Sequence, residues 1–158
     1  MSKFLSWLAI LIWMVLIFNL SSQVAEQSNQ LSTGITEVVL KTVEKFAPGA
    51  EFDTEGFNRI MRKNAHFFAY LILGLLVINA LKRSGVRGYR YVFIALGLGV
   101  LYAISDEVDQ LFVPGRGGQI TDVIIDSAGV SVGIGLYWVI GRVVKNRKSC
   151  SVKPNNEM

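Results

Sequence analysis

The chain has 158 residues, of which 51% are hydrophobic and 18% charged, and its formal net charge is +4. It contains four apolar runs of nearly membrane-spanning length, and a soluble domain of this size could not bury all of them. The positive charge does not indicate nucleic-acid binding, which would need a basic face on a soluble module. The composition therefore predicts an all-α integral membrane protein.

Four segments approach the length of about 20 residues that a helix needs to cross the hydrocarbon core. They are residues 4–20, 65–81, 89–105 and 123–141. We expect helices rather than strands, because backbone exposed to lipid must satisfy its own hydrogen bonds. Together the spans predict one membrane domain over residues 1–158. The first span is expected to be retained, since residues 23–25 match a signal-peptide cleavage pattern poorly.

The segment between the first two spans carries a helical pattern. Apolar residues recur at three- and four-residue spacing from Leu31 to Phe46, and Pro48 and Gly49 follow them. This pattern predicts an amphipathic extracytoplasmic helix that lies on the membrane surface or covers the bundle, or alternatively forms a lid over a site. Asp53 or Thr54 can then cap a new helix that runs directly into the second span.

Glycines are frequent in the third and fourth spans. They are Gly97, Gly99, Gly129, Gly133 and Gly135. Because a small residue lets two helix backbones approach closely in lipid, these glycines predict close packing of the two spans against their neighbours.

The distribution of basic residues predicts the orientation. The 82–90 connection holds four basic residues and no acid, the 142–158 tail is also basic, and Lys3 precedes the first span. By the positive-inside rule these parts and both termini of this multi-pass membrane protein are cytoplasmic. Their basic side chains are expected to contact anionic lipid head groups at the cytoplasmic face. The 21–64 and 106–122 loops are then extracytoplasmic.

Ionisable residues converge at one depth beneath the predicted outer surface. At 1.5 Å per residue, His66 and Asp126 lie about 6 Å inside the second and fourth spans. By the same measure Asp106 and Glu107 lie about 3 to 5 Å inside the third. Ionisable groups in a bilayer normally face one another or a water-filled cavity, which indicates a functional site. The structural alternative is a buried salt-bridge network that sets helix register.

Helical spacing places several of these residues on shared faces. The shared faces hold Lys63, His66 and Tyr70 on one helix, Asp106 with Gln110 on the next, and Asp122 with Asp126 on the last. Structural explanations are also open for single residues. Asp122 suits the start of a helix, where the dipole favours a carboxylate. Arg62 and Lys63 could extend to lipid head groups.

Four motifs occur in a fixed order along the chain. They are Phe18-Asn-Leu-Ser21-Ser22-Gln23, Lys63-x-x-His66-Phe67-x-x-Tyr70, Asp106-Glu107-x-x-Gln110-x-Phe112-x-Pro114-Gly115-Arg116 and Asp122-x-x-x-Asp126-x-x-Gly129. In order and spacing they resemble the VanZ-like family of bacterial membrane proteins over about residues 5–140. The resemblance implies a four-helix envelope protein, and the family's namesake is linked to low-level teicoplanin resistance. The chain departs from the family pattern at Asp126, where Asn is frequent.

The favoured function is binding of a membrane lipid, a lipid-linked cell-wall precursor or a lipoglycopeptide at the outer leaflet. Lys63, His66 and Arg116 would contact phosphate or carboxylate groups, and the acidic residues would orient these cations. The full predicted binding set is Lys63, His66, Tyr70, Asp106, Glu107, Gln110, Arg116, Asp122 and Asp126.

The alternative is an intramembrane hydrolase or transferase acting on a lipid-linked phosphate. His66 would be the general acid or base, with Asp106 or Glu107 as its partner. A divalent cation is also conceivable, held through the carboxylate oxygens of Asp106, Glu107, Asp122 and Asp126. No ligand spacing is diagnostic, however, so no metal or other cofactor is expected. Cys150 is alone and offers no thiolate metal site. A transporter is the weakest alternative, since no internal repeat is visible.

Overall fold

The computed structural model describes residues 3–22, 54–113 and 117–150. This part of the chain forms four helices and no strand: α1 (Lys3–Ser21), α3 (Thr54–Arg83), α4 (Arg90–Gln110) and α5 (Ile120–Cys150). All four are long and apolar enough to cross a membrane, so the predicted all-α membrane fold is confirmed. The predicted amphipathic helix between residues 31 and 46 lies outside the described residues.

The helices are longer than the apolar runs that predicted them. As the capping pattern predicted, α3 begins at Thr54 and continues to Arg83 without a break. The predicted third span ended near residue 105, but α4 continues to Gln110. Similarly, α5 continues to Cys150, through much of the predicted tail. An apolar run marks only the part of a helix that lipid can cover, whereas the hydrogen-bonded backbone continues into polar sequence. The ionisable residues of the layer therefore lie on helices.

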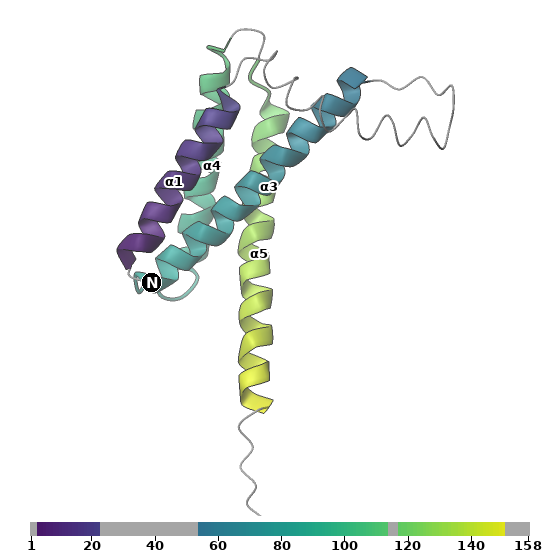
Figure 1. The fold of residues 1–158 in the computed structure, drawn as a ribbon. Helices are drawn as coiled ribbons and strands as arrows, with labels where there is room; N and C mark the ends of the chain where they lie inside the picture. The colour runs from purple at the N-terminus through teal and green to yellow at the C-terminus, as the bar shows by residue number, and fades with distance from the viewer. Residues whose placement is uncertain (1–2, 23–53, 114–116, 151–158) are drawn as a thin grey trace, which may run out of the picture.

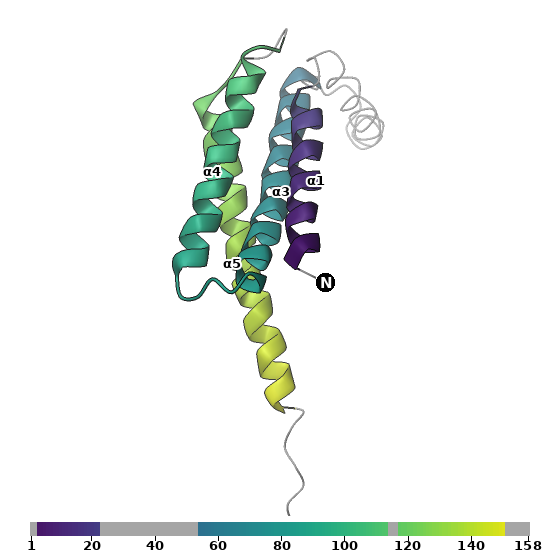
Figure 2. The same ribbon diagram turned by 90° about the vertical axis from the view of Figure 1, so that its left-hand side faces the viewer.

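The helices form a bundle in which α3 contacts each of the other three (Figures 1 and 2). Its most extensive contact is with α5, whereas α1 and α4 touch each other only slightly. We call the end where α1 and α4 finish and α5 begins the site end. The end that carries the α3–α4 connection is the opposite end, and α5 extends beyond it (Figure 1).

Two glycines of α5 bring it close to α3. A Cβ atom on Gly129 would overlap the carbonyl oxygen of Phe67, and one on Gly133 would overlap the carbonyl oxygen of Leu71. A side chain at either position would push the helices apart. The predicted close packing thus holds at these two glycines, and the backbone contact holds the site end of α5 against α3.

Other glycines differ in their surroundings. On α4, a Cβ on Gly99 would meet the side chain of Val130 at 2.7 Å. Gly97 and Gly135 have no atom within 4 Å of an added Cβ, so they face open space rather than a neighbouring helix. The helical period determines which glycines face a neighbouring helix. The number of glycines in a span does not.

Side-chain hydrogen bonds tie α1 to the rest of the bundle, two of them in its middle part. The indole of Trp13 donates to the carbonyl oxygen of Ala69 at 2.9 Å, and the hydroxyl of Tyr102 donates to that of Met14 at 2.6 Å. The outer surfaces of the helices are apolar, with Phe93 and Leu101 among the exposed side chains. An exposed apolar surface of this extent is suited to contact with lipid.

Candidate functional site

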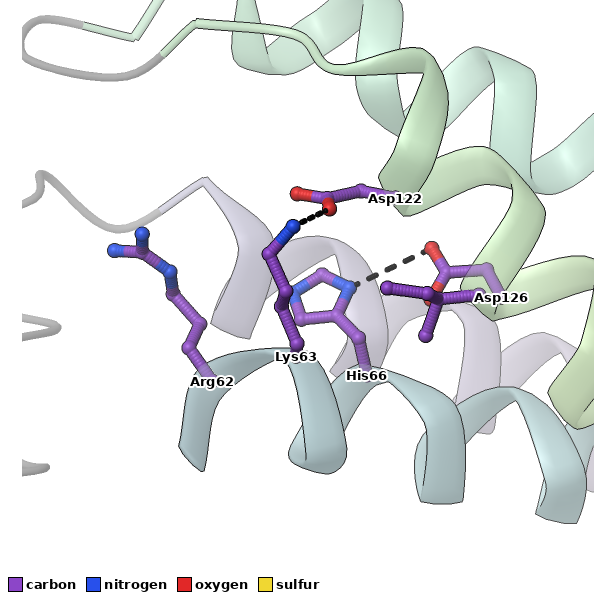
Figure 3. A pocket seen from close by; sticks show the side chains of 6 residues that line it. Arg62, Lys63, His66, Asp122 and Asp126 are labelled. Atoms are coloured by element: carbon purple, nitrogen blue, oxygen red, sulfur yellow. Dashed lines mark hydrogen bonds and ion pairs between the residues drawn. The ribbon is translucent and has the colours of Figure 1, made fainter. Parts of the chain in front are cut away.

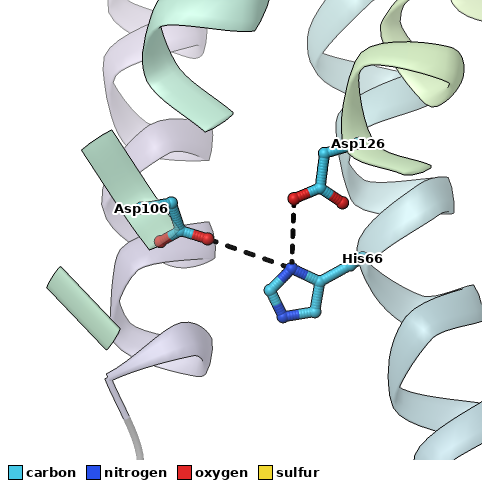
Figure 4. Close-up of side chains that lie close together, drawn as sticks. All are labelled: His66, Asp106 and Asp126. Atoms are coloured by element: carbon cyan, nitrogen blue, oxygen red, sulfur yellow. Dashed lines mark ion pairs between the residues drawn. The ribbon is translucent and has the colours of Figure 1, made fainter. Parts of the chain in front are cut away.

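Acidic side chains from two helices are buried inside the bundle at the site end. Asp106 and Glu107 come from α4 and Asp126 comes from α5, and their relative exposures are 2%, 6% and 0%. His66 of α3 lies between the two aspartates (Figure 4). The structure therefore brings together the layer of charge that residue counting placed at one depth.

The central cluster consists of His66, Asp106 and Asp126. Nδ1 of His66 lies 3.7 Å from Oδ2 of Asp126 and 3.9 Å from Oδ2 of Asp106. Both distances are longer than a hydrogen bond. Within the described part of the chain, none of the four carboxylate oxygens accepts a hydrogen bond of ordinary geometry, although the hydroxyls of Ser21 and Tyr70 lie near Asp106. The cluster holds two carboxylates and one imidazole with little other polar support.

Aromatic rings lie on the interior side of the central cluster. The ring of Tyr70 is fully buried and stacks on that of His66, with a centroid distance of 6.5 Å. The ring of Tyr102 lies 5.9 Å from the ring of Tyr70. The Tyr70 hydroxyl is buried and makes no hydrogen bond of ordinary geometry among the described residues. The rings of Tyr70 and Tyr102 therefore lie between the central cluster and the half of the bundle nearer the opposite end.

Asp122 has a cationic partner of its own. Nζ of Lys63 lies 2.6 Å from its Oδ1, and the two side chains are 28% and 25% exposed. Asp122 also lies in the first turn of α5, where the helix dipole favours a carboxylate. The interaction joins α3 to α5 beside the central cluster, and the ammonium group of Lys63 balances the charge of Asp122.

Glu107 is held by hydrogen bonds rather than by His66. Its Oε2 accepts from the backbone N–H of Gln119 at 2.8 Å, and its Oε1 accepts from Nε2 of Gln110 at 3.2 Å. The same amide of Gln110 donates to Oγ of Ser21 at 2.8 Å. Gln110 thus bonds to Glu107 and Ser21, and not to Asp106 as the shared face suggested. These contacts join the ends of α1 and α4 to the start of α5.

A small polar cavity opens beside the central cluster, with basic side chains at its edge. It is lined by Arg62, Lys63, His66, Asp122, Ile125 and Asp126 (Figure 3). Its volume of about 10 Å³ has room for a single water molecule. The guanidinium of Arg62 points away from Asp122, and within the described residues it has no ion pair.

Three residues belong to the site although the sequence does not predict them there: Arg62, Ser21 and Gln119. For Arg62, the sequence signal is its position beside Lys63. Ser21 lies in a recognised motif, but Gln119 contributes through its backbone N–H, which no residue pattern reveals. Arg116, which was predicted to bind an anion, lies outside the described residues.

Two apolar hollows adjoin the site. A cavity of about 60 Å³ between α1 and α3 reaches His66 and is lined by Ile17, Leu20, Ala65 and Ala69. A larger groove of about 410 Å³ runs between α4 and α5 beside Glu107, and Val108 and Ile120 are among its lining residues. Both hollows place apolar surface directly next to the polar end of the bundle.

A model of the VanZ/LLP1 family matches residues 5–141. The chain belongs to this family. The match covers most of the chain and includes every residue of the central cluster, so the site lies inside the VanZ/LLP1 domain. No curated protein and no solved structure was found to match the chain.

In this VanZ/LLP1 protein the site has two chemically distinct parts. The rim carries a guanidinium and an ammonium group, from Arg62 and Lys63, which are suited to an anion. The floor carries the central cluster, in which an imidazole faces two buried carboxylates. A floor of this kind can hold a proton or a cation, because two anions in an apolar layer need a compensating positive charge.

Proposed function

We propose that this VanZ/LLP1 protein binds the anionic head group of a lipid at the site end. The lipid is a membrane phospholipid or a lipid-linked cell-wall precursor. The observation that carries the proposal is the pair of cations, Arg62 and Lys63, at the rim of the polar cavity. Lys63 shares its charge with Asp122, whereas the guanidinium of Arg62 points outward and offers a planar fork to phosphate.

The dimensions of the cavity support binding at its rim. With a volume of about 10 Å³, the cavity has room for one water but not for a phosphate group. The head group would therefore contact Arg62 and Lys63 from outside. The lipid tail would remain in the bilayer, where the hollow between α1 and α3 offers apolar surface beside His66.

Native mass spectrometry of the protein in mild detergent tests this binding. The probes are a polyprenyl phosphate, phosphatidylglycerol and the zwitterionic phosphatidylethanolamine. We expect one of the two anionic probes to bind most tightly, and which one does so identifies the lipid source. Arg62→Gln should weaken this binding about tenfold, since one charge-assisted pair is lost. Arg83→Gln at the opposite end is the matched control and should bind as the wild type does. Equal binding by Arg62→Gln and the wild type would reject the proposal.

The proposal includes an orientation with the site end outside the bacterial plasma membrane and both termini in the cytoplasm. The basic residues of the α3–α4 connection support it, through the positive-inside rule. A Cys150→Ser background removes the chain's single cysteine. In intact cells a membrane-impermeant thiol reagent should label Gly117→Cys, where an added Cβ meets no atom within 4 Å. It should not label Tyr89→Cys, which is 73% exposed. The reverse pattern would overturn the orientation.

We further propose that the protein raises tolerance to teicoplanin, to which the namesake of the resembled family gives low-level resistance. The same rim would meet either the antibiotic or the lipid-linked precursor. Expression in a susceptible bacterial host should raise the minimal inhibitory concentration, and Arg62→Gln at equal abundance should reduce that increase. If the wild-type protein leaves the tolerance of the host unchanged, the resistance role is rejected for this chain.

One observation favours an enzyme as the second candidate. Nδ1 of His66 faces the two aspartates, and the other ring nitrogen faces the cavity and its basic rim (Figure 3). A histidine oriented by carboxylates can act as a general base that takes a proton from a water molecule as the water attacks a bound phosphate ester. Incubation of a polyprenyl diphosphate with the protein decides between the candidates. Release of phosphate that is abolished by His66→Gln would indicate a hydrolase, and quantitative recovery of the lipid would indicate a binding protein.

A further inference from the structure

We infer that His66, Asp106 and Asp126 form a site for one divalent transition-metal ion, with Zn²⁺ as the best-fitting example. The inference rests on the geometry of the central cluster and not on the lipid-binding proposal. It also replaces the expectation from the sequence that no metal is bound.

The three ligand atoms lie close enough together to surround one metal ion. Nδ1 of His66 lies 3.7 and 3.9 Å from the two Oδ2 atoms, and all three ligand atoms lie within 4.8 Å of one another. Ligand atoms about 2.0 to 2.1 Å from a tetrahedral zinc ion lie about 3.3 to 3.4 Å apart, so the two distances from Nδ1 are about half an ångström too long for that geometry. Small side-chain rotations would close that difference.

The two aspartates are buried beside few polar groups, which are the imidazole of His66 and the hydroxyls of Ser21 and Tyr70. The side chains of Asp106 and Asp126 are 1% and 0% exposed. Their four oxygens accept no hydrogen bond of ordinary geometry within the described part of the chain. A divalent cation bound between them would balance two negative charges and satisfy one oxygen of each carboxylate. Lys63 does not serve this purpose, because its ammonium group is bonded to Asp122.

The ligand set selects among metals. An imidazole nitrogen suits zinc and other first-row transition ions, whereas Mg²⁺ and Ca²⁺ prefer oxygen ligands throughout. One histidine and two carboxylates leave a fourth tetrahedral position open, as in catalytic zinc sites. The adjoining polar cavity is lined by His66 and Asp126 and has room for one water molecule. That water is the expected fourth ligand.

Two acids considered from the sequence as ligands are excluded by their partners. Glu107 accepts hydrogen bonds from Gln119 and Gln110, and Asp122 is paired with Lys63. The competing account of the central cluster needs no metal: a proton on the imidazole or on a carboxylate would balance part of the charge. The two accounts differ in whether a metal ion binds at one per chain.

The test is a titration of the chelator-treated full-length protein, in detergent and without a histidine tag, against Zn²⁺ with a chromophoric chelator as competitor. We expect one ion per chain and a rise in melting temperature on binding. Asp106→Asn, Asp126→Asn and His66→Gln should each weaken binding by about 100-fold or more, since a direct ligand matters at least as much as an outer-shell partner. Asp109→Asn, one helical turn from Asp106, is the matched control and should retain wild-type affinity.

X-ray absorption of the zinc-loaded protein should show nitrogen and oxygen ligands and no sulfur, which separates this site from Cys150. A wild-type protein that binds no ion, or Asp126→Asn and Asp106→Asn variants that bind as tightly as the wild type, would overturn the inference. The lipid-binding test probes the rim through Arg62, so the two proposals can fail separately.

Discussion

At the site end the acidic side chains of Asp106, Glu107 and Asp126 are buried in the bundle, whereas at the opposite end the basic side chains are exposed. Asp106 and Asp126 are buried with few polar contacts. Lys82 is exposed and lies over the rings of Tyr91 and Tyr137, with its Nζ 5.1 and 4.8 Å from their centroids. Exposed cations can reach water and lipid head groups at little cost, whereas buried carboxylates are costly. This difference supports our proposal that the site end binds a ligand.

The largest expected effect comes from separating α3 and α5 at the site end. Gly129→Leu would force a side chain into the carbonyl group of Phe67 and should destabilise the bundle by about 3 kcal/mol or more. Gly135→Leu is the matched control on the same helix and should have little effect, because its added Cβ meets no atom within 4 Å. Unfolding in a denaturing detergent series measures both. Similar losses in the two variants would contradict the packing account.

A second change should separate function from folding. His66→Phe keeps a ring of similar size against Tyr70 but removes the nitrogen that faces the two aspartates. We expect membrane abundance to be retained and lipid binding to fall about tenfold, because the imidazole lines the polar cavity at whose rim the head group would bind. Lys82→Met at the opposite end should leave binding unchanged. A well-expressed His66→Phe variant with full binding would remove His66 from the site.

A third change concerns the ion pair at the edge of the site. Lys63 and Asp122 are about one-quarter exposed, so solvent screens their attraction. A double-mutant cycle with Lys63→Met and Asp122→Asn should give a coupling free energy of unfolding of about 0.5 to 1 kcal/mol. A much larger coupling free energy would mean that Lys63 and Asp122 stabilise the fold as strongly as a buried ion pair.

The smallest effect is expected at the opposite end. Lys82→Met removes the cation above Tyr91 and Tyr137, and an exposed interaction of this kind contributes about 0.5 to 1 kcal/mol. Arg142→Met should behave similarly, because its guanidinium lies 5.4 Å from the ring centroid of Trp138. Thermal unfolding compares each variant with the wild type. A loss as large as that of Gly129→Leu would erase the distinction between the two ends.

Much of the architecture could be predicted from the sequence, because apolar length identifies spans and residue counting gives depth. The layer that holds His66, Asp106 and Asp126 followed from that counting. The pairing within the layer did not, since it depends on how each helix is rotated about its axis. Helical spacing alone could not show that Glu107 would bond to a backbone N–H or that Arg62 would point outward.

The central claim is that the buried aspartates are kept for binding and not for stability. The most direct test is the melting temperature of the chelator-treated protein with Asp106→Asn or Asp126→Asn. We predict that neither change lowers it, and that relief of the crowded charges raises it by about 2 to 4 °C per kcal/mol gained. A salt-bridge network that sets helix register predicts the opposite, because breaking a buried pair costs about 3 to 5 kcal/mol. A fall of several degrees in both variants would contradict the claim.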